Sequence, residues 1–269
     1  MPELPEVEFA RKQLSRWLTK GKIARATIAD ARILDAGVKS ADVVRALRGK
    51  TIRDVVRRGK WLRIALDKGI IFSHFGMTGK WVLAEDDEPV RFEKVRIDVE
   101  QAKKRRSVCY IDPRLFGRFV VTENDLKAWT ALGPDPLLDG IDAEALHQKL
   151  QKRKIAIKQA LLDQTVLAGI GNIQATEALF FARIDPRRPA PDITRTETKA
   201  LGAGMMRAIR ETLALQTGPT LAYVEDAGAK NPFKIYGHGG DLCPRCRKAK
   251  LAKIVLAGRG TVFCPNCQK

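Results

Sequence analysis

Long hydrophobic segments, aromatic residues and histidines are all scarce in this sequence. No apolar run approaches the roughly 18 residues that a membrane-spanning helix needs. Aromatic residues make up 6% of the 269 residues, and the three histidines lack the spacing of metal ligands. The first six residues are acidic and proline-rich, unlike a secretory signal, so we expect a cytosolic protein. A hydrophobic content of 45% with 30% charged residues excludes global disorder.

Two nucleotide-binding motifs are incomplete. A phosphate loop ending at Gly49-Lys50-Thr51 would need glycine at position 44, where the sequence has Val44. A dinucleotide fingerprint starting at Gly169-Ile-Gly171 would need glycine at position 174, where it has Gln174. We therefore expect no nucleotide cofactor.

Acidic residues are outnumbered throughout the chain. There are 49 Lys and Arg against 31 Asp and Glu, a net charge of +18. Residues 1–134 hold 28 basic and 18 acidic side chains, so the excess is not confined to a tail. A positive field of this size attracts polyanions, chiefly nucleic acid, with anionic membrane as the lesser option. A basic protein that is merely soluble is the less favoured alternative.

Four of the five cysteines form two matched pairs. Cys243 with Cys246 and Cys264 with Cys267 are C-x-x-C turns separated by 17 residues, the spacing of a four-thiolate zinc ribbon. Two disulfides are the alternative, which fits poorly with a cytosolic chain. We predict one structural zinc ion, whose four protein ligands leave no open position for catalysis. Cys109 lies in an apolar strand and is predicted to be a buried hydrophobic residue.

The segment between the cysteine pairs predicts a hairpin. Residues 251–263 form two short β-patterned runs joined by a Gly-Arg-Gly turn, with Arg259 at its tip. Segment 241–269 holds seven basic residues and one acidic residue. On so basic a ribbon, we favour insertion of Arg259 into a nucleic-acid groove over a merely solvated turn residue.

The rest of the chain divides into a β-rich half and a helical half. A helical period covers residues 5–18. The break Gly133-Pro-Asp-Pro136 predicts a linker. Strands are expected at 27–34, 51–56, 61–66, 69–74, 80–84, 95–100, 108–111 and 118–122, and helices at 142–151, 154–163, 172–182 and 195–216. We predict a multi-domain α+β protein with an N-terminal β-sandwich that carries an N-terminal helix, then a helical domain and a zinc ribbon.

The N-terminus offers a source of chemistry. If Met1 is removed, Pro2 presents a secondary amine, and an α-amino group has a pKa of about 8, well below that of a lysine. Such an amine can form a Schiff base with an aldehyde-level carbon, which in DNA is C1′ of deoxyribose. Glu3 and Glu6 follow one helical turn apart and could shuttle protons. From residue types alone a simpler interpretation ranks first, because glutamates in a first helical turn favour the macrodipole.

Several sequence blocks change that ranking. They are Met1-Pro-Glu-Leu-Pro-Glu-Val-Glu8, Arg58-Gly-Lys60-Trp-Leu62, His74-Phe-Gly-Met77-Thr-Gly79, Asp112-Pro-Arg114-Leu-Phe116-Gly117, Gly169-Ile-Gly-Asn172-Ile173 and the cysteine ribbon. Together they resemble the formamidopyrimidine-DNA glycosylase (Fpg/Nei) family of base-excision repair enzymes, and most closely its bacterial formamidopyrimidine members. The resemblance implies a β-sandwich domain over 1–134, a helix–two-turn–helix domain over 135–236 and a four-cysteine zinc finger over 237–269. It also implies a bacterial protein that associates with the nucleoid through double-stranded damaged DNA, and we expect it to act as a monomer.

The resemblance further implies the site residues. Pro2 would be the nucleophile and Glu3 the proton donor and general acid/base, with support from Glu6 and with Lys60 near the lesion phosphates. Met77, Arg114 and Phe116 match the residues that fill the gap left by an extruded nucleotide, while Lys158, Asn172 and Arg259 match DNA-binding positions. The implied activity is that of a DNA glycosylase and apurinic/apyrimidinic-site lyase, which excises an oxidised or ring-opened base and then breaks the strand by β- and δ-elimination.

Three departures from the family pattern bear on the lesion. Leu115 stands where a second arginine is common, and Gln174 stands where a tyrosine usually follows Asn-Ile. The segment 220–235 is shorter than the loop that commonly closes over 8-oxoguanine, so a formamidopyrimidine, an oxidised pyrimidine or a bulkier base is an alternative lesion. Two other functions remain open: a non-catalytic zinc-ribbon protein that binds nucleic acid, and a lyase acting mainly on abasic sites.

Overall fold

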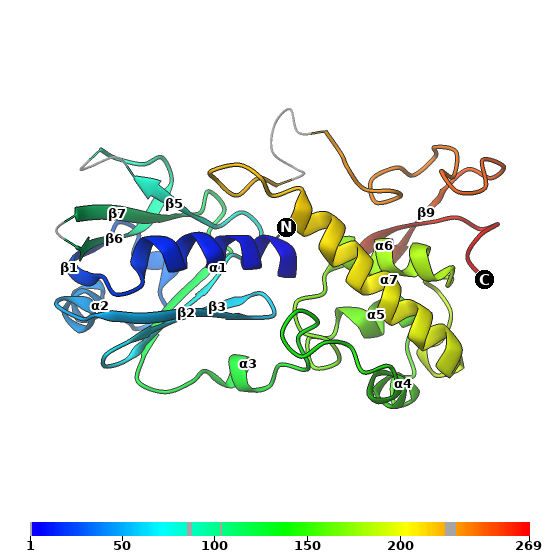
Figure 1. Ribbon diagram of the computed structural model, residues 1–269, viewed down its shortest axis with the longest axis horizontal. Helices are drawn as coiled ribbons and strands as arrows, with labels where there is room; N and C mark the ends of the chain where they lie inside the picture. The colour runs from blue at the N-terminus through cyan, green and yellow to red at the C-terminus, as the bar shows by residue number, and fades with distance from the viewer. Residues whose placement is uncertain (1, 85–87, 103, 224–229) are drawn as a thin grey trace. The chain divides into compact units, whose positions relative to one another are not determined.

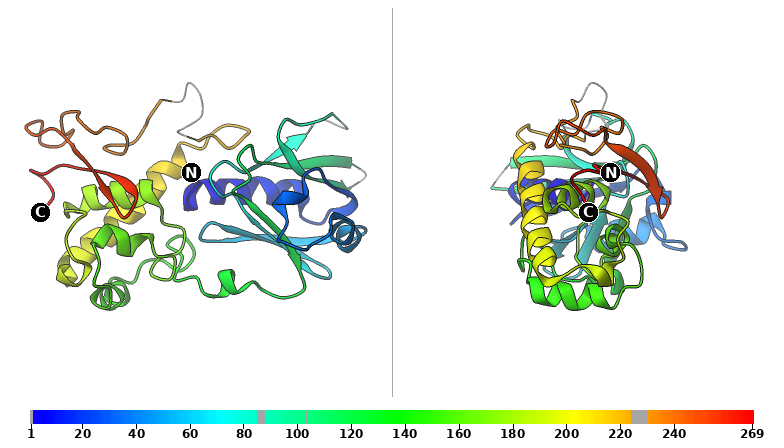
Figure 2. Two further views of the ribbon diagram at one scale, coloured as in Figure 1. Left: turned by 180° about the vertical axis from the view of Figure 1, so that it is seen from behind. Right: turned by 90° about the vertical axis from the view of Figure 1, so that its right-hand side faces the viewer.

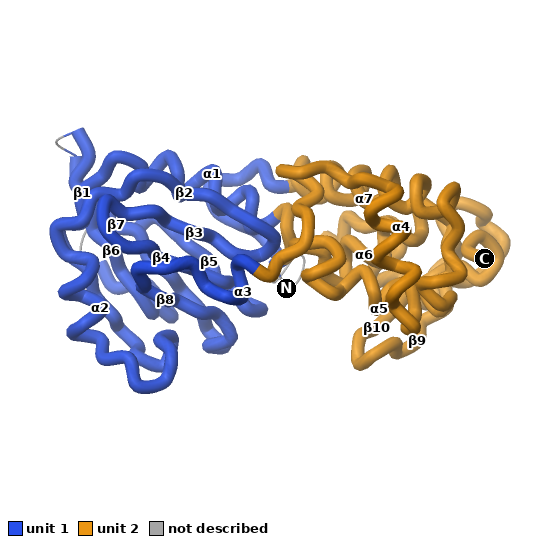
Figure 3. Tube along the Cα trace, turned by 90° about the horizontal axis from the view of Figure 1, so that it is seen from below, with its two compact units in different colours: residues 1–2, 6–130, 216–223 blue, residues 3–5, 131–215, 224–269 orange. Residues whose placement is uncertain are grey.

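The computed structural model describes residues 2–84, 88–102, 104–223 and 230–269 (Figures 1 and 2). These residues form two compact units (Figure 3). Unit 1 comprises residues 2, 6–130 and 216–223, and unit 2 comprises residues 3–5, 131–215 and 230–269. The α+β fold class is confirmed, because unit 1 contains two β-sheets whereas unit 2 is mainly helical and carries the cysteine pairs in a small hairpin module.

Unit 1 is built on two four-stranded antiparallel sheets. The first has the order β1-β6-β7-β5 and the second the order β2-β3-β4-β8. The strands are β1 (Lys22–Ile28), β2 (Ile52–Arg58), β3 (Trp61–Leu66), β4 (Ile70–His74), β5 (Lys80–Ala84), β6 (Glu93–Gln101), β7 (Lys104–Ile111) and β8 (Arg118–Thr122). Helix α1 (Leu4–Leu18) contributes Val7, Leu14 and Leu18 to the apolar core that both sheets share.

The beginning of unit 1 corrects the sequence prediction. The expected strand over 27–34 is wrong, because β1 ends at Ile28 and Ala31–Ile33 form a 3-10 helix. A register shift between Ile23 and Arg25 breaks the alternation of β1, so its buried residues, Ile23 and Ala26, lie three positions apart. Two further short helices, α2 (Ser40–Leu47) and α3 (Lys127–Thr130), were not predicted.

Unit 2 is a set of helices around its own apolar core. The helices are α4 (Ala143–Gln151), α5 (Ile157–Leu162), α6 (Asn172–Ala182) and α7 (Arg195–Ala214), with a 3-10 turn at Ala190–Asp192. The Asp142 carboxylate accepts hydrogen bonds from two N–H groups at the start of α4. Thr194 and Glu197 form a reciprocal capping box at the start of α7. The predicted helices of this half are confirmed, with α5 shorter at both ends.

The C-terminal hairpin of unit 2 is confirmed, but the predicted turn is wrong: the strands are joined by Ala257 and Gly258, both with positive φ, and Arg259 is the first residue of the second strand rather than the tip. Strands β9 (Ala252–Leu256) and β10 (Arg259–Phe263) pair antiparallel. Phe180 of α6 and Ile235 pack with the buried Cys243 and Cys264 in a small cluster. The cysteine module is therefore part of unit 2 rather than a separate appendage.

Residues 216–223 follow α7 but belong to unit 1. Leu221 and Tyr223 join the core of the two sheets, and the Tyr223 hydroxyl donates to Gly79 O at 2.6 Å. Among the helices of the described residues, none has the length and apolar composition required to cross a membrane.

Candidate functional site

The Glu3 carboxylate is buried against the N-terminal end of α6 in unit 2. Its Oε1 accepts a hydrogen bond from the Ile173 N–H at 2.8 Å, and its Oε2 accepts from the N–H groups of Gly171 and Gln174, both at 3.0 Å. The first N–H groups of a helix lack partners inside the helix and carry partial positive charge, so they stabilise an anion. Glu3, which is 1% exposed, is therefore held in one orientation.

The loop before α6 is shaped for this contact. Gly171 precedes the helix, and a Cβ placed there would overlap the Glu3 carboxyl group. Glycine is thus required by the close approach of the side chain. Leu4, the residue after Glu3, also contacts this loop, because its N–H donates to Gly169 O at 3.0 Å. Backbone and side chain together fasten residues 3 and 4 to the Gly-Ile-Gly loop.

Two of the predicted DNA-binding residues of unit 2 meet the finger hairpin. The Lys158 ammonium lies 2.8 Å from Thr261 Oγ1, and the Asn172 amide nitrogen donates to Gly260 O at 3.0 Å. Arg259, the first residue of β10, is exposed. The structure thus brings Lys158 and Asn172 to the strand that begins at Arg259. Asn172 lies at the first residue of α6 rather than within the preceding loop.

Lys158 is a buried cation. It is 1% exposed, and burial lowers its pKa to about 8, although the negative charge of Glu3 acts to raise it. The Asn172 side-chain oxygen is buried and has no hydrogen-bond partner among the residues that the structure describes. The Lys158 ammonium and the Asn172 side-chain oxygen are thus polar groups near the finger of unit 2 that take no part in its apolar core.

Unit 1 carries the other predicted catalytic residues. Pro2 and Glu6 are buried, whereas Lys60 is half-buried in the turn between β2 and β3. Burial, together with the positive charges of Lys60 and Arg118, lowers the pKa of His74 to about 4. His74 is consequently neutral at neutral pH, and its Nδ1 accepts a hydrogen bond from the backbone of the loop that follows it.

The three predicted gap-filling residues lie on two loops of unit 1. Met77 is 36% exposed and Phe116 is 52% exposed, which is unusual for such large apolar side chains. The Arg114 guanidinium carbon lies 4.8 Å from the centroid of the Phe116 ring. Between them, Leu115 adopts a positive φ of 56°, so the backbone turns sharply at this departure from the family pattern.

The four cysteines of the ribbon come together as a metal site. Their sulfurs all lie within 4.8 Å of one another, and two of the separations are 3.9 Å (Cys243–Cys267) and 3.8 Å (Cys246–Cys264). Sulfurs about 2.3 Å from a tetrahedral zinc lie about 3.8 Å apart, whereas a disulfide needs about 2.0 Å. The donor set fits Zn²⁺, which would link both ends of the finger and stabilise its fold.

Asp112 and Glu177 are two of several buried carboxylates among the described residues to which the sequence assigned no role. Asp112, fully buried, accepts hydrogen bonds from both gap-filling loops. Glu177 accepts from three consecutive backbone N–H groups, those of Lys234, Ile235 and Tyr236. Glu177 could have been noticed as a charged residue in the apolar helix 172–182. Asp112 carries no comparable signal, because an Asp-Pro pair is also common in solvated turns.

The departures at Gln174 and in segment 220–235 have different outcomes. Gln174 is fully buried, and its side-chain nitrogen donates to Thr212 Oγ1 of α7 at 2.8 Å, so the amide joins two helices. Residues 224–229 of the shortened segment lie outside the described residues.

The fold and the cysteine cluster define a zinc-finger protein with a β-sheet unit and a helical unit. Family models match three stretches of the chain, which are the formamidopyrimidine-DNA glycosylase N-terminal domain (residues 1–119), the formamidopyrimidine-DNA glycosylase H2TH domain (132–222) and a zinc finger found in FPG and IleRS (240–269). The chain belongs to the formamidopyrimidine-DNA glycosylase family, and its finger holds one structural zinc ion.

Relatives match the chain over its whole length. It is 38% identical to the formamidopyrimidine-DNA glycosylase of Desulfitobacterium hafniense and 38% identical to that of Geobacter metallireducens, with full coverage of both proteins. Among solved structures, it resembles the Lactococcus lactis enzyme bound to DNA containing an abasic site, with a TM-score of 0.86, 30% identity and 99% coverage of each chain. A complex of the L. lactis enzyme with FAPY-dG-containing DNA matches equally well, with a TM-score of 0.86, 30% identity and coverage of 99% and 100%.

Proposed function

We propose that this protein is a bifunctional DNA glycosylase and abasic-site lyase of base-excision repair. Its substrate is double-stranded DNA with an oxidised or ring-opened base. The observation that carries the proposal is the side chain of Glu3, the residue that follows Pro2, because three backbone N–H groups hold its carboxylate in place. A fixed acid–base group beside a secondary amine is what amine-initiated base excision needs. Family membership and the DNA complexes of its relatives add support.

The reaction begins with the Pro2 nitrogen, once Met1 has been removed. The amine attacks C1′ of the damaged nucleotide, and the C1′–N bond to the base breaks. The base departs with the bond's electron pair and takes up a proton delivered through Glu3. The nitrogen, now bonded to C1′, loses its proton, and its lone pair then forms a double bond to C1′. At the same time the C1′–O4′ bond of the sugar ring breaks and O4′ takes up that proton, which leaves an iminium ion. This cation acidifies the C2′ proton, and proton loss expels the 3′ phosphate by β-elimination. A second, δ-elimination expels the 5′ phosphate.

The remaining predicted residues receive supporting roles in this proposal. Glu6 supports the N-terminal acid–base pair, and Lys60 neutralises phosphate charge near the lesion. Met77, Arg114 and Phe116 form the wedge that occupies the space of the flipped nucleotide, since extruding a base costs a few kcal/mol of stacking and pairing. Lys158, Asn172 and Arg259 bind the DNA backbone on the helical unit and its finger.

We assign these roles to domains over 1–134, 135–236 and 237–269. The division of unit 1 from unit 2 after residue 130 supports the first boundary, and the zinc-finger match from residue 240 supports the second. The zinc ion stabilises the finger. We propose that the protein acts as a monomer, without a nucleotide cofactor, on DNA in the bacterial nucleoid.

Borohydride trapping tests the proposed function. The protein is incubated with a duplex carrying one formamidopyrimidine lesion, and borohydride reduces any imine to a stable enzyme–DNA adduct. We expect an adduct whose attachment maps to Pro2, and its loss when the N-terminus is acetylated. Glu3→Gln is the internal control, because it removes the acid that base departure needs while leaving the amine. This variant should retain adduct formation on abasic DNA much better than on the intact lesion.

The outcomes separate the alternatives. Undiminished trapping after acetylation would refute Pro2 as the nucleophile. A wild-type protein that binds the duplex without forming an adduct would be a nucleic-acid-binding protein, and one active only on abasic DNA would be a lyase. Mass spectrometry of the intact N-terminus accompanies the assay, because retained Met1 would leave no free proline amine.

A further inference from the structure

The two loops that bear the wedge residues are joined by one buried side chain, that of Asp112. We call residues 75–79 the methionine loop and residues 112–117 the arginine loop. Both belong to unit 1. Asp112 Oδ1 accepts a hydrogen bond from Thr78 Oγ1 at 2.6 Å, which crosses from one loop to the other. The Asp112 carboxylate is fully buried and Thr78 is half-buried, so this short bond is partly shielded from water.

Asp112 also fixes the arginine loop itself. Its Oδ1 accepts from the Arg114 N–H at 3.2 Å, and its Oδ2 accepts from the Gly117 N–H at 2.8 Å. The carboxylate therefore closes the loop between its first and last residues. Arg114 and Phe116 lie inside this closed turn, so the backbone positions of both are set by a single side chain.

Glycines allow the two loops to approach each other. A Cβ on Gly76 would overlap the Phe116 carbonyl group, and a Cβ on Gly79 or Gly117 would overlap the Tyr110 hydroxyl. That hydroxyl thus lies between one glycine of each loop, and it donates to His74 O at 3.1 Å. The loops therefore approach each other closely through backbone and through Tyr110, and a larger residue at Gly76, Gly79 or Gly117 would not fit.

The methionine loop is also held at its ends. The Gly79 N–H donates to Phe75 O at 2.9 Å, and the Gly76 N–H donates to His74 Nδ1 at 3.1 Å. The Tyr223 hydroxyl donates to Gly79 O at 2.6 Å. Met77 itself remains 36% exposed. The exposed Met77 thus projects from a loop that hydrogen bonds hold on both sides of it, at Gly76 and at Gly79.

We propose that Asp112 is a positioning residue that locks the methionine and arginine loops into one wedge before DNA arrives. The inference rests on the proposed function, because it gives Met77, Arg114 and Phe116 their role in base extrusion. Pre-ordered loops need not lose conformational freedom when the wedge enters the helix. The stacking and hydrogen bonding that the wedge supplies can then offset the loss of base pairing. Asp112 contacts no reacting atom and acts through the loops.

The test compares two substrates that differ only in the need for a wedge. One carries the lesion in a fully paired duplex, and the other carries the same lesion inside a short mismatched bubble, where little pairing has to be broken. Single-turnover excision is measured for wild type and Asp112→Asn. An amide keeps the shape but presents an N–H₂ to one of the donors, so at least one loop bond is lost. Relative to wild type, we expect Asp112→Asn to excise the base at least about tenfold more slowly from the duplex, and less than about threefold more slowly from the bubble.

Thr78 supplies a matched control pair. Thr78→Val removes the bond between the loops while preserving shape, and Thr78→Ser keeps the hydroxyl. We expect the valine variant to show the same duplex-selective slowing and the serine variant to excise at nearly the wild-type rate. If Asp112→Asn does not fold, as judged by circular dichroism, the Thr78 pair carries the comparison alone.

Two results would overturn the inference. Equal slowing on duplex and bubble would mean that the Asp112 hydrogen bonds support only the general stability of the protein. Unchanged excision from the duplex would mean that the two loops need not be joined through Asp112. Either is distinct from failure of the proposed function, in which wild-type protein releases no base from either substrate.

Discussion

In unit 1 the buried Glu8 and Asp98 lie against arginine side chains, whereas in unit 2 Glu3 and Glu177 lie against backbone N–H groups. Glu8 accepts from the buried Arg57 at 3.1 Å. Burial acts to raise the pKa of Glu8, but hydrogen bonds and charge from Arg11 and Arg57 outweigh it, so that pKa lies below its ordinary value.

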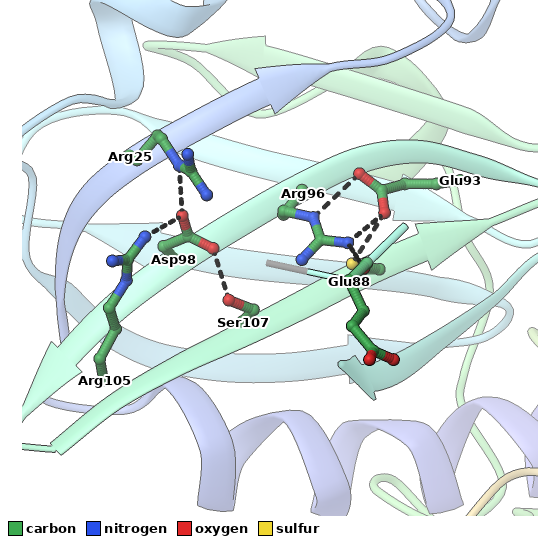
Figure 4. A network of polar contacts seen from close by, with 8 residues as sticks. Arg25, Glu88, Glu93, Arg96, Asp98, Arg105 and Ser107 are labelled. Carbon is green, nitrogen blue, oxygen red and sulfur yellow. Dashed lines mark hydrogen bonds and ion pairs between the residues drawn. The ribbon is translucent and has the colours of Figure 1, made fainter. Parts of the chain in front are cut away.

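Figure 4 shows a second carboxylate held by arginine side chains, in the sheet of unit 1 with the order β1-β6-β7-β5. Asp98 of β6 accepts from Arg25 at 2.6 Å, from Arg105 at 3.0 Å and from Ser107 at 2.7 Å. Its pKa is lowered as well, since these bonds outweigh the opposing effect of burial. Side chains of β1 and β7, the two strands that flank β6, thus satisfy one carboxylate.

The difference follows from what each kind of secondary structure leaves unpaired. Inside a sheet, as at Asp98, and in the body of a helix, as at Glu8, the backbone N–H groups are already used by the ladder or the helix. A buried carboxylate there must find donors on other side chains. At a helix N-terminus and in loops, backbone N–H groups can donate hydrogen bonds to an anion. Asp112 is the instructive case in unit 1, because it lies in a loop and is held by backbone N–H groups and a hydroxyl in the manner of unit 2.

Removal of zinc should have the largest effect on stability. The finger holds negative charge in a third way, because a metal ion neutralises its cysteine thiolates. Structural zinc contributes on the order of 10 kcal/mol to folding of such modules. We expect a strong chelator, or Cys264→Ser, to unfold residues 238–269 while leaving the sheets of unit 1 intact. Hydrogen exchange and zinc content provide the measurement. Cys109→Ala, which alters a buried cysteine of unit 1, should retain one zinc per chain.

Glu8→Gln should be the costliest change to a carboxylate. It leaves the Arg57 guanidinium buried without a full counter-charge, and breaking a buried ion pair costs about 3–5 kcal/mol. Urea unfolding measures the loss. A cost below about 1 kcal/mol would show that Arg57 is satisfied by other groups, such as Gly59 O at 3.1 Å, and would remove the distinction between the units.

Acid should weaken unit 1 through His74. Its pKa is about 4 in the folded protein against 6.5 in an unfolded chain, so the folded state disfavours protonation. The resulting stability is complete above pH 6.5 and is lost as the pH falls towards 4, on the order of 2–3 kcal/mol in all. His74→Asn should flatten the dependence of unfolding free energy on pH in that window. His147→Asn, in unit 2, serves as the control, and a slope that survives the His74 substitution would contradict the prediction.

Glu177→Gln should have the smallest effect. The partners of Glu177 are neutral backbone amides, so no buried charge is left behind, and the glutamine oxygen can still accept one of the three bonds. We expect a loss of about 1–2 kcal/mol together with faster hydrogen exchange at Lys234, Ile235 and Tyr236. A cost equal to that of Glu8→Gln would break the comparison between the units.

Much of the fold could be predicted from periodicity. The runs that became β3, β4, β5 and β8 alternate or are continuously apolar, and α4 and α7 of unit 2 begin at recognisable caps. Strand β1 was misplaced because a bulge puts its buried residues three apart, which is not a strand spacing. Helix α2 was missed because its core contacts are limited to Val43 and Leu47 and its N-cap residue, Lys39, makes no side-chain cap.

The sequence by itself determined the zinc finger, since its ligands come in pairs only three residues apart and a local turn is enough to present both sulfurs. It also placed Pro2 beside Glu3 and spread positive charge over the chain. Only the tertiary structure decided what holds Glu3, whose three donors lie about 170 residues away, and what joins Thr78 to Asp112 across 34 residues. Such bonds depend on the spare donors that folding exposes at a helix end or inside a loop, and no residue pattern along the chain records where those donors will meet a carboxylate.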